Sequence, residues 1–278
     1  MASTSSWRPW RIPELVKLYG TFWMANLKSR MEYRISFLLW FGNTIAFHAV
    51  SIGIIWALLS RFPSLNGWDF SEMLFLYALG LLARGIYTTF FFPIMRIPYM
   101  IRQGNFDRHL IRPLNPLFQI LLQGSFTSIN DMVVGVVVFA AALQRVDVTW
   151  RLPLALFLAA VVVGAGLIQA AVSLMVASAS FWVIKVSSLT WTVQQIQNEL
   201  VRYPVSIYGR AVQMILTVAL PIAFTNYYPA TTLLGKEDGS LLPAQQLGFL
   251  TPLVGLLWFG LAYAIWKHGV NRYQGTGS

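Results

Sequence analysis

The chain has 278 residues, of which 56% are apolar and 11% charged, and this charged share is about half that of an average soluble protein. A soluble domain of this length could not cover so much apolar surface, so the composition excludes that class and favours a single-domain integral membrane protein. The absence of cysteine excludes disulfides and thiolate metal sites, and the net charge of +10 fits membrane orientation better than nucleic acid binding, because the basic residues lie between apolar runs.

The first 34 residues are predicted to form a cytoplasmic arm. Within residues 13–34, apolar side chains recur at helical spacing among basic ones: Leu15, Leu18, Phe22 and Leu27, with Lys17, Lys28 and Arg30. Such a helix can lie along the lipid headgroups with its apolar side down. The alternative is a basic leader that merely precedes the first span. We see no apolar core followed by a small-residue cleavage site, so we expect no cleaved signal peptide.

Residues 35–266 are predicted to form an all-α membrane domain of six transmembrane helices, because six stretches approach the roughly 20 residues that a crossing needs. We place them at Ile35–Ser60, Ser71–Phe92, Leu117–Leu143, Leu152–Ile184, Arg210–Asn226 and Leu247–Trp266. The fourth is longer than a bilayer requires, so it should tilt or protrude. The fifth is short and carries Pro221, so we expect a kink there or a broken, re-entrant segment through residues 226–229.

The basic residues predict the orientation of these spans. With both termini in the cytoplasm, the inner segments hold fifteen Lys and Arg residues and the outer loops hold four, while Arg84 lies inside a span. Cytoplasmic loops carry an excess of Lys and Arg. The asymmetry therefore predicts that the N-terminal arm, the loops after the second and fourth spans, and the tail at residues 267–278 are cytoplasmic.

The loop after the second span, residues 94–124, combines apolar and charged side chains between prolines. Pro98 opens a short predicted helix, and Pro113 and Pro116 close it, because proline disfavours helix in the residue before it. An amphipathic helix held by stiff prolines can move as a lever, and its exposed aromatic side chain can enter a groove on a cytoplasmic partner. An ordinary positive-inside loop fits the same residues.

Two charged residues fall inside predicted spans. Arg84 lies toward the inner end of the second span and Asp131 near the middle of the third, so antiparallel neighbours would bring them within reach. A charge at the bilayer centre costs about 2.5–3.5 kcal/mol on insertion scales, so it usually needs a partner or a wet cavity. A structural ion pair, a substrate or gating role, and snorkelling without a partner all fit this placement.

Other polar and small residues of the spans have less specific interpretations. The inner half of the third span, with Asn130, is polar enough to face protein or a cavity rather than lipid. His48 in the first span is interpreted as a hydrogen-bonded packing residue; His109 and His268 lie too far from it in sequence to indicate a metal cluster. A small-residue stripe in the fourth span allows close packing within the chain or between two subunits: Gly166, Ala170, Ser173 and Ala177.

Two segments beyond these have open interpretations. Residues 185–208 are polar and are predicted to form an inner loop that either contacts a partner or is simply solvated. Trp68, Trp258, Tyr227 and Tyr228 lie near predicted outer or interfacial zones and are interpreted as membrane-interface anchors, with an outer gate formed by Tyr227 and Tyr228 as the alternative.

The sequence contains none of the common catalytic motifs. We find no G-x-x-x-x-G-K-[ST] loop for ATP, no strand followed by G-x-G-x-x-G, no G-x-S-x-G elbow and no H-E-x-x-H helix. We therefore expect neither an enzyme nor a cofactor held by this chain.

One segment carries a family resemblance. The run from Arg102 to Pro116, RQGNFDRHLIRPLNP, resembles the first inner loop of type 2 ABC exporter permeases, in the subgroup with the pattern R-x-G-x-hydrophobic-D-x-x-L-x-R-P-L-N-P. Residues 202–208 and 220–230 carry a second and less specific resemblance. The likeness covers nearly the whole chain in order.

The resemblance implies a permease subunit of an ATP-driven exporter in the inner (plasma) membrane of a prokaryote. Such a subunit pairs with a second permease and with two ATPase subunits, which hold the ATP and Mg. Gly104 would permit a close approach or a turn, Phe106 would be the apolar anchor, and Arg102 and Arg108 would meet acidic groups or lipid phosphate. Asp107 would brace Arg108 or cap a helix. By match to the motif, the ATPase-coupling element comprises Arg102, Gly104, Phe106, Asp107, Arg108, Arg112 and Pro113.

Two other classes of function compete with the exporter. A self-sufficient secondary transporter or channel often shows inverted repeats and several intramembrane acids, whereas here only Asp131 is central and no repeat is visible. A membrane-embedded enzyme needs a cluster of His, Asp, Glu or Ser near one interface, and the sequence shows none. The cargo of an exporter stays open, although the few charges in the spans favour an amphipathic or hydrophobic one.

Overall fold

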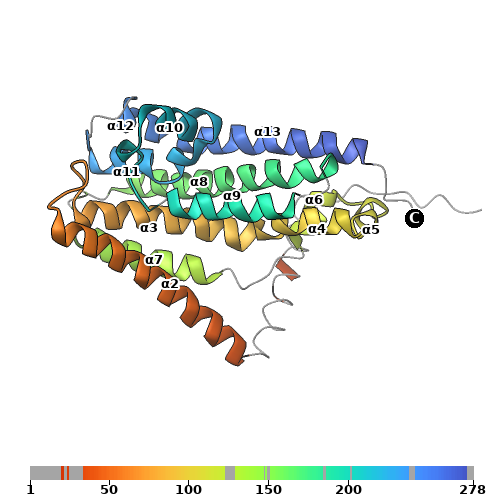
Figure 1. The fold of residues 1–278 in the computed structure, drawn as a ribbon, viewed down its shortest axis with the longest axis horizontal. Coiled ribbons are helices and arrows are strands. Elements are labelled where there is room, and N and C mark those ends of the chain that lie inside the picture. Colours follow the sequence, from red (N-terminus) through yellow and green to blue (C-terminus); the bar gives the residue numbers. More distant parts are fainter. Residues whose placement is uncertain are drawn as a thin grey trace, which may run out of the picture.

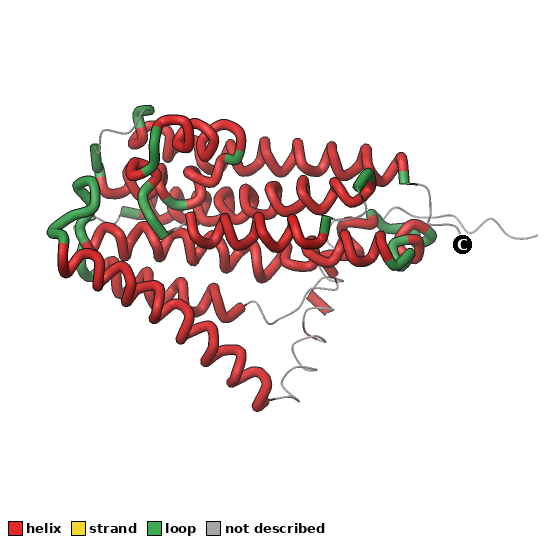
Figure 2. The backbone as a smooth tube through the Cα atoms, viewed as in Figure 1, coloured by secondary structure: helices red, strands yellow, loops and turns green. Residues whose placement is uncertain are grey.

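The computed structural model describes residues 20–21, 24, 34–122, 129–146, 148, 151–183, 186–200, 202–237 and 242–273. Within these residues all regular elements are helical, and the long helices lie side by side in one bundle (Figure 1, Figure 2). The helices are α2 (Arg34–Arg61), α3 (Phe70–Ile86), α4 (Ile97–Arg102), α5 (Asp107–Leu110), α6 (Pro116–Leu122), α7 (Ile129–Leu143), α8 (Leu152–Ser178), α9 (Ser187–Leu200), α10 (Arg210–Met214), α11 (Tyr227–Leu234), α12 (Ala244–Leu247) and α13 (Thr251–Arg272).

Four continuous helical runs are long and apolar enough to cross a membrane: Ile35–Arg61, Phe70–Arg102, Leu152–Phe181 and Ala244–Arg272. They support the predicted first, second, fourth and sixth spans and make the chain a multi-pass membrane protein. The second run extends ten residues beyond the predicted end at Phe92. A π-helical turn at Tyr87–Phe91 and a 3₁₀ turn at Phe92–Arg96 carry the helix past Pro93 into α4. The prolines stand in the first turns of these pieces, where they are tolerated.

Parts of three predictions lie outside the described residues. The predicted third span, Leu117–Leu143, corresponds to α6 and the shorter apolar helix α7, and residues 123–128 between them are not described. A continuous crossing there therefore stays a prediction. Most of the predicted interfacial helix at residues 13–34 and the end of the tail at residues 274–278 are also outside the described residues.

The predicted fifth span, Arg210–Asn226, does not run the length of the bundle. Asn66 in the α2–α3 turn donates to the carbonyl of Ser206, and Asn226 donates to the carbonyl of Leu76 near the start of α3. The segment therefore begins and ends at the same end of the bundle, which carries α10, α11 and α12 (Figure 1). Leu220, with φ of −132° and ψ of 95°, breaks the helix before Pro221. The prediction of a crossing is wrong here, and the alternative of a broken segment at Pro221 is confirmed.

We call this end the re-entrant end, and the opposite end, which carries α4, α5 and the last turn of α13, the α4–α5 end. The helix α9 runs from the α4–α5 end along α8 (Figure 1), and the chain after it reaches the re-entrant end at Ser206. Gln194 and Gln197 on α9 are buried, at 7% and 1% exposure. The segment therefore passes from one end of the bundle to the other instead of staying in a loop at one end, and protein surrounds part of the polar face of α9. Contact of this segment with a partner stays a prediction.

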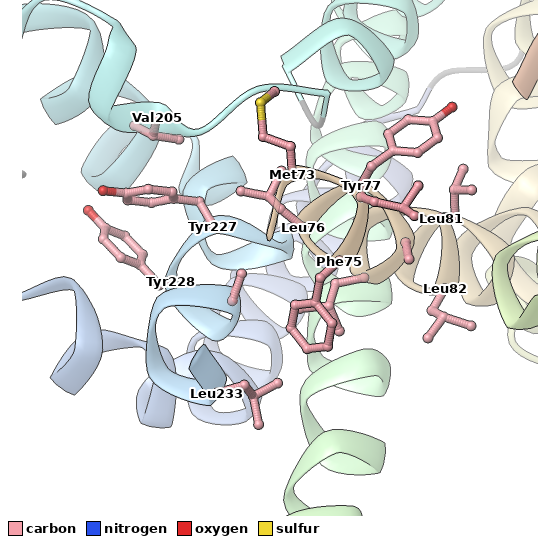
Figure 3. Close-up of a cluster of buried hydrophobic side chains, with 14 of the residues drawn as sticks. Met73, Phe75, Leu76, Tyr77, Leu81, Leu82, Val205, Tyr227, Tyr228 and Leu233 are labelled. Carbon is pink, nitrogen blue, oxygen red and sulfur yellow. The ribbon is translucent and has the colours of Figure 1, made fainter. Parts of the chain in front are cut away.

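The centre of the bundle is α3, which is buried on nearly all sides and forms much of the main apolar cluster shown in Figure 3. Its start is fixed by a capping box in which Asp69 and Glu72 each accept from the other's backbone N–H. On α8, a Cβ atom at Gly166 would lie 2.5 Å from the side chain of Ile86, and one at Gly164 would lie 2.7 Å from the Cα of Pro252 on α13. All four residues of the small-residue stripe of α8 are buried, so the stripe packs within the chain.

Candidate functional site

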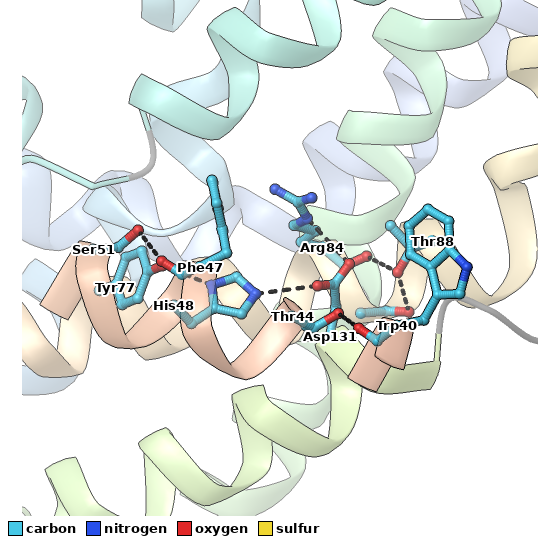
Figure 4. Close-up of polar contacts among 10 residues, drawn as sticks. Trp40, Thr44, Phe47, His48, Ser51, Tyr77, Arg84, Thr88 and Asp131 are labelled. Carbon is cyan, nitrogen blue, oxygen red and sulfur yellow. Dashed lines mark hydrogen bonds and ion pairs between the residues drawn. The ribbon is translucent and has the colours of Figure 1, made fainter. Parts of the chain in front are cut away.

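A network of polar side chains lies where α2, α3 and α7 meet (Figure 4). Arg84 Nε is 3.2 Å from Asp131 Oδ2, and Asp131 Oδ1 is 3.1 Å from Nε2 of His48. The other ring nitrogen of His48, Nδ1, is 2.8 Å from the hydroxyl of Tyr77. The carboxylate is therefore held from two sides, and the network joins three helices.

Two glycines allow α3 and α7 to approach closely enough for this pairing. A Cβ atom on Gly85 would lie 2.7 Å from the Cα of Met132, and one on Gly135 would lie 3.1 Å from the backbone of Leu81. Arg84 and Asp131, which adjoin Gly85 and Met132 in sequence, reach each other across this short gap. The predicted ion pair is confirmed and unpartnered snorkelling of Arg84 is wrong, while a role in gating or substrate contact stays a prediction.

Two other polar residues of the spans are also buried. His48 is 2% exposed, and its two hydrogen bonds confirm the interpretation as a hydrogen-bonded packing residue. Asn130 is 2% exposed, and its Oδ1 has no hydrogen-bond partner among the described residues. The assignment of Asn130 to a transport pathway stays a prediction.

A narrow cleft adjoins the network. Arg202, in the turn after α9, pairs with Glu199 at 3.0 Å, and its guanidinium lies 5.3 Å from the ring centroid of Phe47. The cleft therefore brings together amides, aromatic rings and two arginines that both have acidic partners. Its walls come from α2, α3, α8, α9 and that turn, through Phe47, His48, Tyr77, Gly80, Leu81, Arg84, Gln169, Gln197, Asn198 and Arg202.

The segment between Pro98 and Pro113 folds into two short helices, α4 and α5, at the α4–α5 end instead of the single helix that the prolines predict. Gly104 has φ of +70°, in the left-handed region that favours glycine, and it lies in the turn between α4 and α5. Pro98 stands in the first turn of α4, as predicted, and Pro116 begins α6. The predicted turn at Gly104 is confirmed, and it is this turn that divides the helix.

Phe106 is fully buried, which corrects the expectation that the aromatic side chain of this loop is exposed. Its ring lies 5.5 Å from that of Phe181, 5.7 Å from Trp266 and 5.2 Å from Tyr273, measured between centroids. These rings belong to the ends of α8 and α13, so Phe106 anchors the loop to its own bundle. Neighbouring His109 is also buried, and this burial lowers the pKa of its imidazole, while a hydrogen bond with Gln119 opposes the shift.

The outward face of the loop is both apolar and basic. Tyr99, Leu110 and Ile111 are 50%, 41% and 83% exposed. The guanidinium of Arg102 lies 5.7 Å from the ring centroid of Tyr99. Arg108 donates to the side chain of Asn105, not to Asp107. Asp107 is the first residue of α5. We call the exposed residues of this face the loop surface: Tyr99, Arg102, Asp107, Arg108, Leu110, Ile111, Arg112 and Pro113.

The aromatic residues of the re-entrant end are packed inside the protein. Tyr227 and Tyr228 lie in the main apolar cluster (Figure 3). Trp68 and Tyr227 are fully buried and their ring centroids lie 6.0 Å apart, and the Tyr228 hydroxyl is 2.7 Å from that of Thr217. The interpretation of these three residues as membrane-interface anchors is wrong, because no large part of their surface reaches the lipid. Trp258 on α13 is half-buried. An outer gate formed by Tyr227 and Tyr228 stays a prediction.

Sequence reasoning missed the contribution of α9 to the cleft. Gln194 and Gln197 stand three residues apart and so share a face of the helix, a spacing that signals a polar stripe. The polarity of the segment predicts only that it lies outside the bilayer, against a partner or in water. The pairing of Arg202 with Phe47 had no sequence signal, since the two residues are separated by more than half of the chain.

Comparison with known families gives one match. The family model described as "ABC-2 family transporter protein" matches residues 45–277, which is most of the chain. No curated protein and no solved structure matches it.

Proposed function

Because the chain belongs to the ABC-2 family of transporter proteins, it is an ABC transporter permease, and we propose that it is the membrane subunit of an ATP-driven exporter. Permeases of this family work with ABC ATPase partners. In the proposal, ATP and Mg are bound and hydrolysed on such a partner, and a second permease subunit completes the exporter. The chain moves a hydrophobic or amphipathic substrate out of the cytoplasm.

The observation that carries the proposal is the loop surface. It combines exposed apolar side chains, Tyr99 and Ile111, with the exposed guanidinium groups of Arg102, Arg108 and Arg112. Apolar anchors surrounded by arginine are typical of protein contact sites. The surface stands on the loop that Phe106 fixes to α8 and α13, so a push on it would be transmitted to two of the long helices.

The distribution of charge supports a cytoplasmic position for this loop. Arg202 and Arg210 are among the residues that the sequence predicts for an inner loop. In the structure Arg202 lines the cleft and Arg210 begins α10 at the re-entrant end, so neither is counted with an inner loop. With these two reassigned, and with Lys185 outside the described residues, the N-terminal arm, the α4–α5 end and the tail hold twelve Lys and Arg residues, against five at the re-entrant end. This excess favours the orientation with both termini in the cytoplasm.

The proposal is tested by purifying the tagged chain from its own membranes with its partners. We expect an ATPase subunit to co-purify and to hydrolyse MgATP. Tyr99→Ala and Arg108→Glu should release that subunit without lowering the melting temperature of the chain, because both side chains are exposed. Arg61→Glu, an exposed charge reversal at the re-entrant end, is the matched control and should retain it.

The competing class predicts a different result. A self-sufficient secondary transporter or channel would move substrate across liposomes that contain this chain alone, with no ATPase added. Flux of that kind, together with retention of any co-purifying ATPase by Arg108→Glu, would overturn the proposal.

A further inference from the structure

The helix α9 is polar on the face that it turns away from the bundle. Four exposed residues follow one another at intervals of four, three and four positions, so they form one stripe along the helix: Ser188, Thr192, Gln195 and Glu199. The buried residues Thr190, Gln194 and Gln197 lie on the opposite face of α9. This polar stripe is therefore the part of α9 that lies farthest from its own bundle.

The polar stripe lies at the depth of the membrane-spanning helices. The helix α9 runs along α8 between the two ends of the bundle (Figure 1). Asn198, which adjoins Glu199 in sequence, lines the same cleft as His48 from the middle of α2 and Gln169 from α8. Glu199 is thus level with residues inside two of the spans rather than with the ends of the bundle.

The outer helices α2 and α13 have a different surface. Their outward side chains are apolar, as at Val50 and Leu257, which are both 63% exposed. On α9 the side chain of Glu199 is 58% exposed, although it pairs with Arg202. A polar or charged group in contact with lipid tails is costly, and it usually faces a partner or a water-filled cavity. Lipid is therefore the least favourable neighbour for this face.

Water suits the polar stripe better than a packed protein surface does. A tight contact with another subunit would desolvate the Glu199 carboxylate and would have to supply hydrogen-bond partners for each polar group. Water supplies them without a fixed geometry. Exposed apolar side chains flank the stripe on both sides, namely Leu189 and Ile196 on one and Trp191 on the other. A wall of this mixed kind fits an amphipathic cargo.

We infer that the outward face of α9 lines a water-filled passage at membrane depth, with Thr192, Gln195 and Glu199 in contact with water. The use of this passage by the exported cargo rests on the proposed function, whereas contact with water does not require an ATPase.

The chain contains no cysteine, so each introduced thiol reports on its own position. Single-cysteine variants of the full chain, with its partners in phosphatidylcholine nanodiscs, are treated with a charged methanethiosulfonate reagent, and labelling is read on this chain after separation. We expect Thr192→Cys and Gln195→Cys to react nearly as fast as Ser64→Cys in the exposed α2–α3 turn. Val50→Cys and Leu257→Cys should react about a hundredfold more slowly, because the reactive thiolate would have to form as a charge among lipid tails.

All five positions are exposed, so each variant should melt as the unaltered chain does, and unequal labelling cannot then arise from misfolding. Labelling of Thr192→Cys and Gln195→Cys as slow as that of Val50→Cys would overturn the inference. A disulfide-linked dimer of the Gln195→Cys chain, formed under oxidation in that case, would assign the face to a second copy of the chain.

The role of the passage in transport is tested in the same nanodiscs. If cargo passes along α9, a non-hydrolysable ATP analogue with Mg should change the labelling rate of Gln195→Cys and leave that of Ser64→Cys unaltered, because only a transport passage opens and closes with nucleotide. Fast labelling that is independent of nucleotide would overturn the assignment to cargo and identify a permanently hydrated groove. Failure of any ATPase to co-purify would count against the proposed function and leave the contact with water standing.

Discussion

The two outer helices α2 and α13 are both largely uncovered by protein, yet they are attached to the bundle by different means. Gly255 on α13 meets the backbone of Gly164 on α8, and Gly269 meets the ring of Phe181. By contrast, Gly42 and Gly53 on α2 have no atom within 4 Å of where a Cβ would stand. The attachment of α2 includes polar contacts of His48, which bonds Tyr77 and Asp131.

This difference illustrates two ways to hold helices together in a membrane. Lipid tails are as apolar as leucine, so helices associate through close packing and through polar contacts rather than through the hydrophobic effect. Close contacts at several glycines, such as Gly255 and Gly269 on α13, are spread along a helix and leave that helix little freedom to move. A polar contact concentrates the attachment at one place. We therefore expect α13 to be fixed and α2 to be the helix that moves more easily.

The largest effect is expected from a large side chain at Gly255, where α13 packs against Gly164 of α8. In Gly255→Leu the new Cβ would lie 2.8 Å from the Cα of Gly164, and neither backbone can yield. We expect a loss of about 4 kcal/mol or more, seen as little monodisperse protein after extraction in detergent. Gly260→Leu is the matched control on the same helix, where a Cβ meets no atom within 4 Å, and it should be extracted normally. Equal yields of the two variants would contradict the packing of α13 described here.

The second effect concerns the end of α13. Truncation of Phe106 to Ala should cost about 3 kcal/mol, as for other fully buried aromatic side chains, because its ring contacts Trp266 and Tyr273. The melting temperature of the chain should fall clearly. Tyr99→Ala, which removes an exposed ring from the same loop, should leave it within a degree or two. If the two variants had the same melting temperature, Phe106 would not be an internal anchor.

A smaller effect is expected at the attachment of α2. Asp131→Asn removes the anion between Arg84 and His48, at a cost of about 2 kcal/mol, which is below that of a fully buried pair because the Arg84 side chain is 23% exposed. Amide exchange in α2 should increase more than in α13. Asp107→Asn, an exposed carboxylate on the loop surface, is the control and should change neither. Restored stability in the double variant Arg84→Met, Asp131→Leu would show that the cost arises from the uncompensated charge.

Much of this arrangement was predictable from the sequence. Apolar length predicted six spans, of which four are long helices in the structure. The isolated charges of Arg84 and Asp131 gave an ion pair as one of three interpretations, because a charge in lipid usually needs a partner or a wet cavity. The turn at Gly104 followed from the freedom of glycine.

The errors have a common physical origin. Hydropathy measures the preference of a segment for lipid or water, and it contains no information about burial of the segment against other parts of the protein. Hydropathy therefore places the segment around Gln197 outside the bilayer, in water or against a partner, and the segment at Arg210–Asn226 in lipid, as a crossing or as a broken segment. The burial of Phe106 could not be foreseen either, because its ring partners come from the ends of two distant helices.

The smallest predicted effect is a pH dependence of the melting temperature that arises at the α4–α5 end, from His109, and not at the attachment of α2. His109 is buried beside Phe106, and burial lowers its pKa below the usual value of about 6.5, so the folded chain favours the neutral imidazole. The unfolded chain then binds a proton at this imidazole more readily than the folded chain does. The contribution of the neutral imidazole to the free energy of unfolding is therefore fully present above pH 6.5 and declines as the pH falls below it. His109→Gln keeps a polar side chain that cannot be protonated. The fall in melting temperature between pH 7.5 and 5.5 should therefore be smaller in this variant than in the unaltered chain, by a few degrees at most. His268→Gln, on the exposed face of α13, is the control and should retain the full decline. An identical decline in the His109 variant would mean that protonation of this imidazole does not loosen the loop.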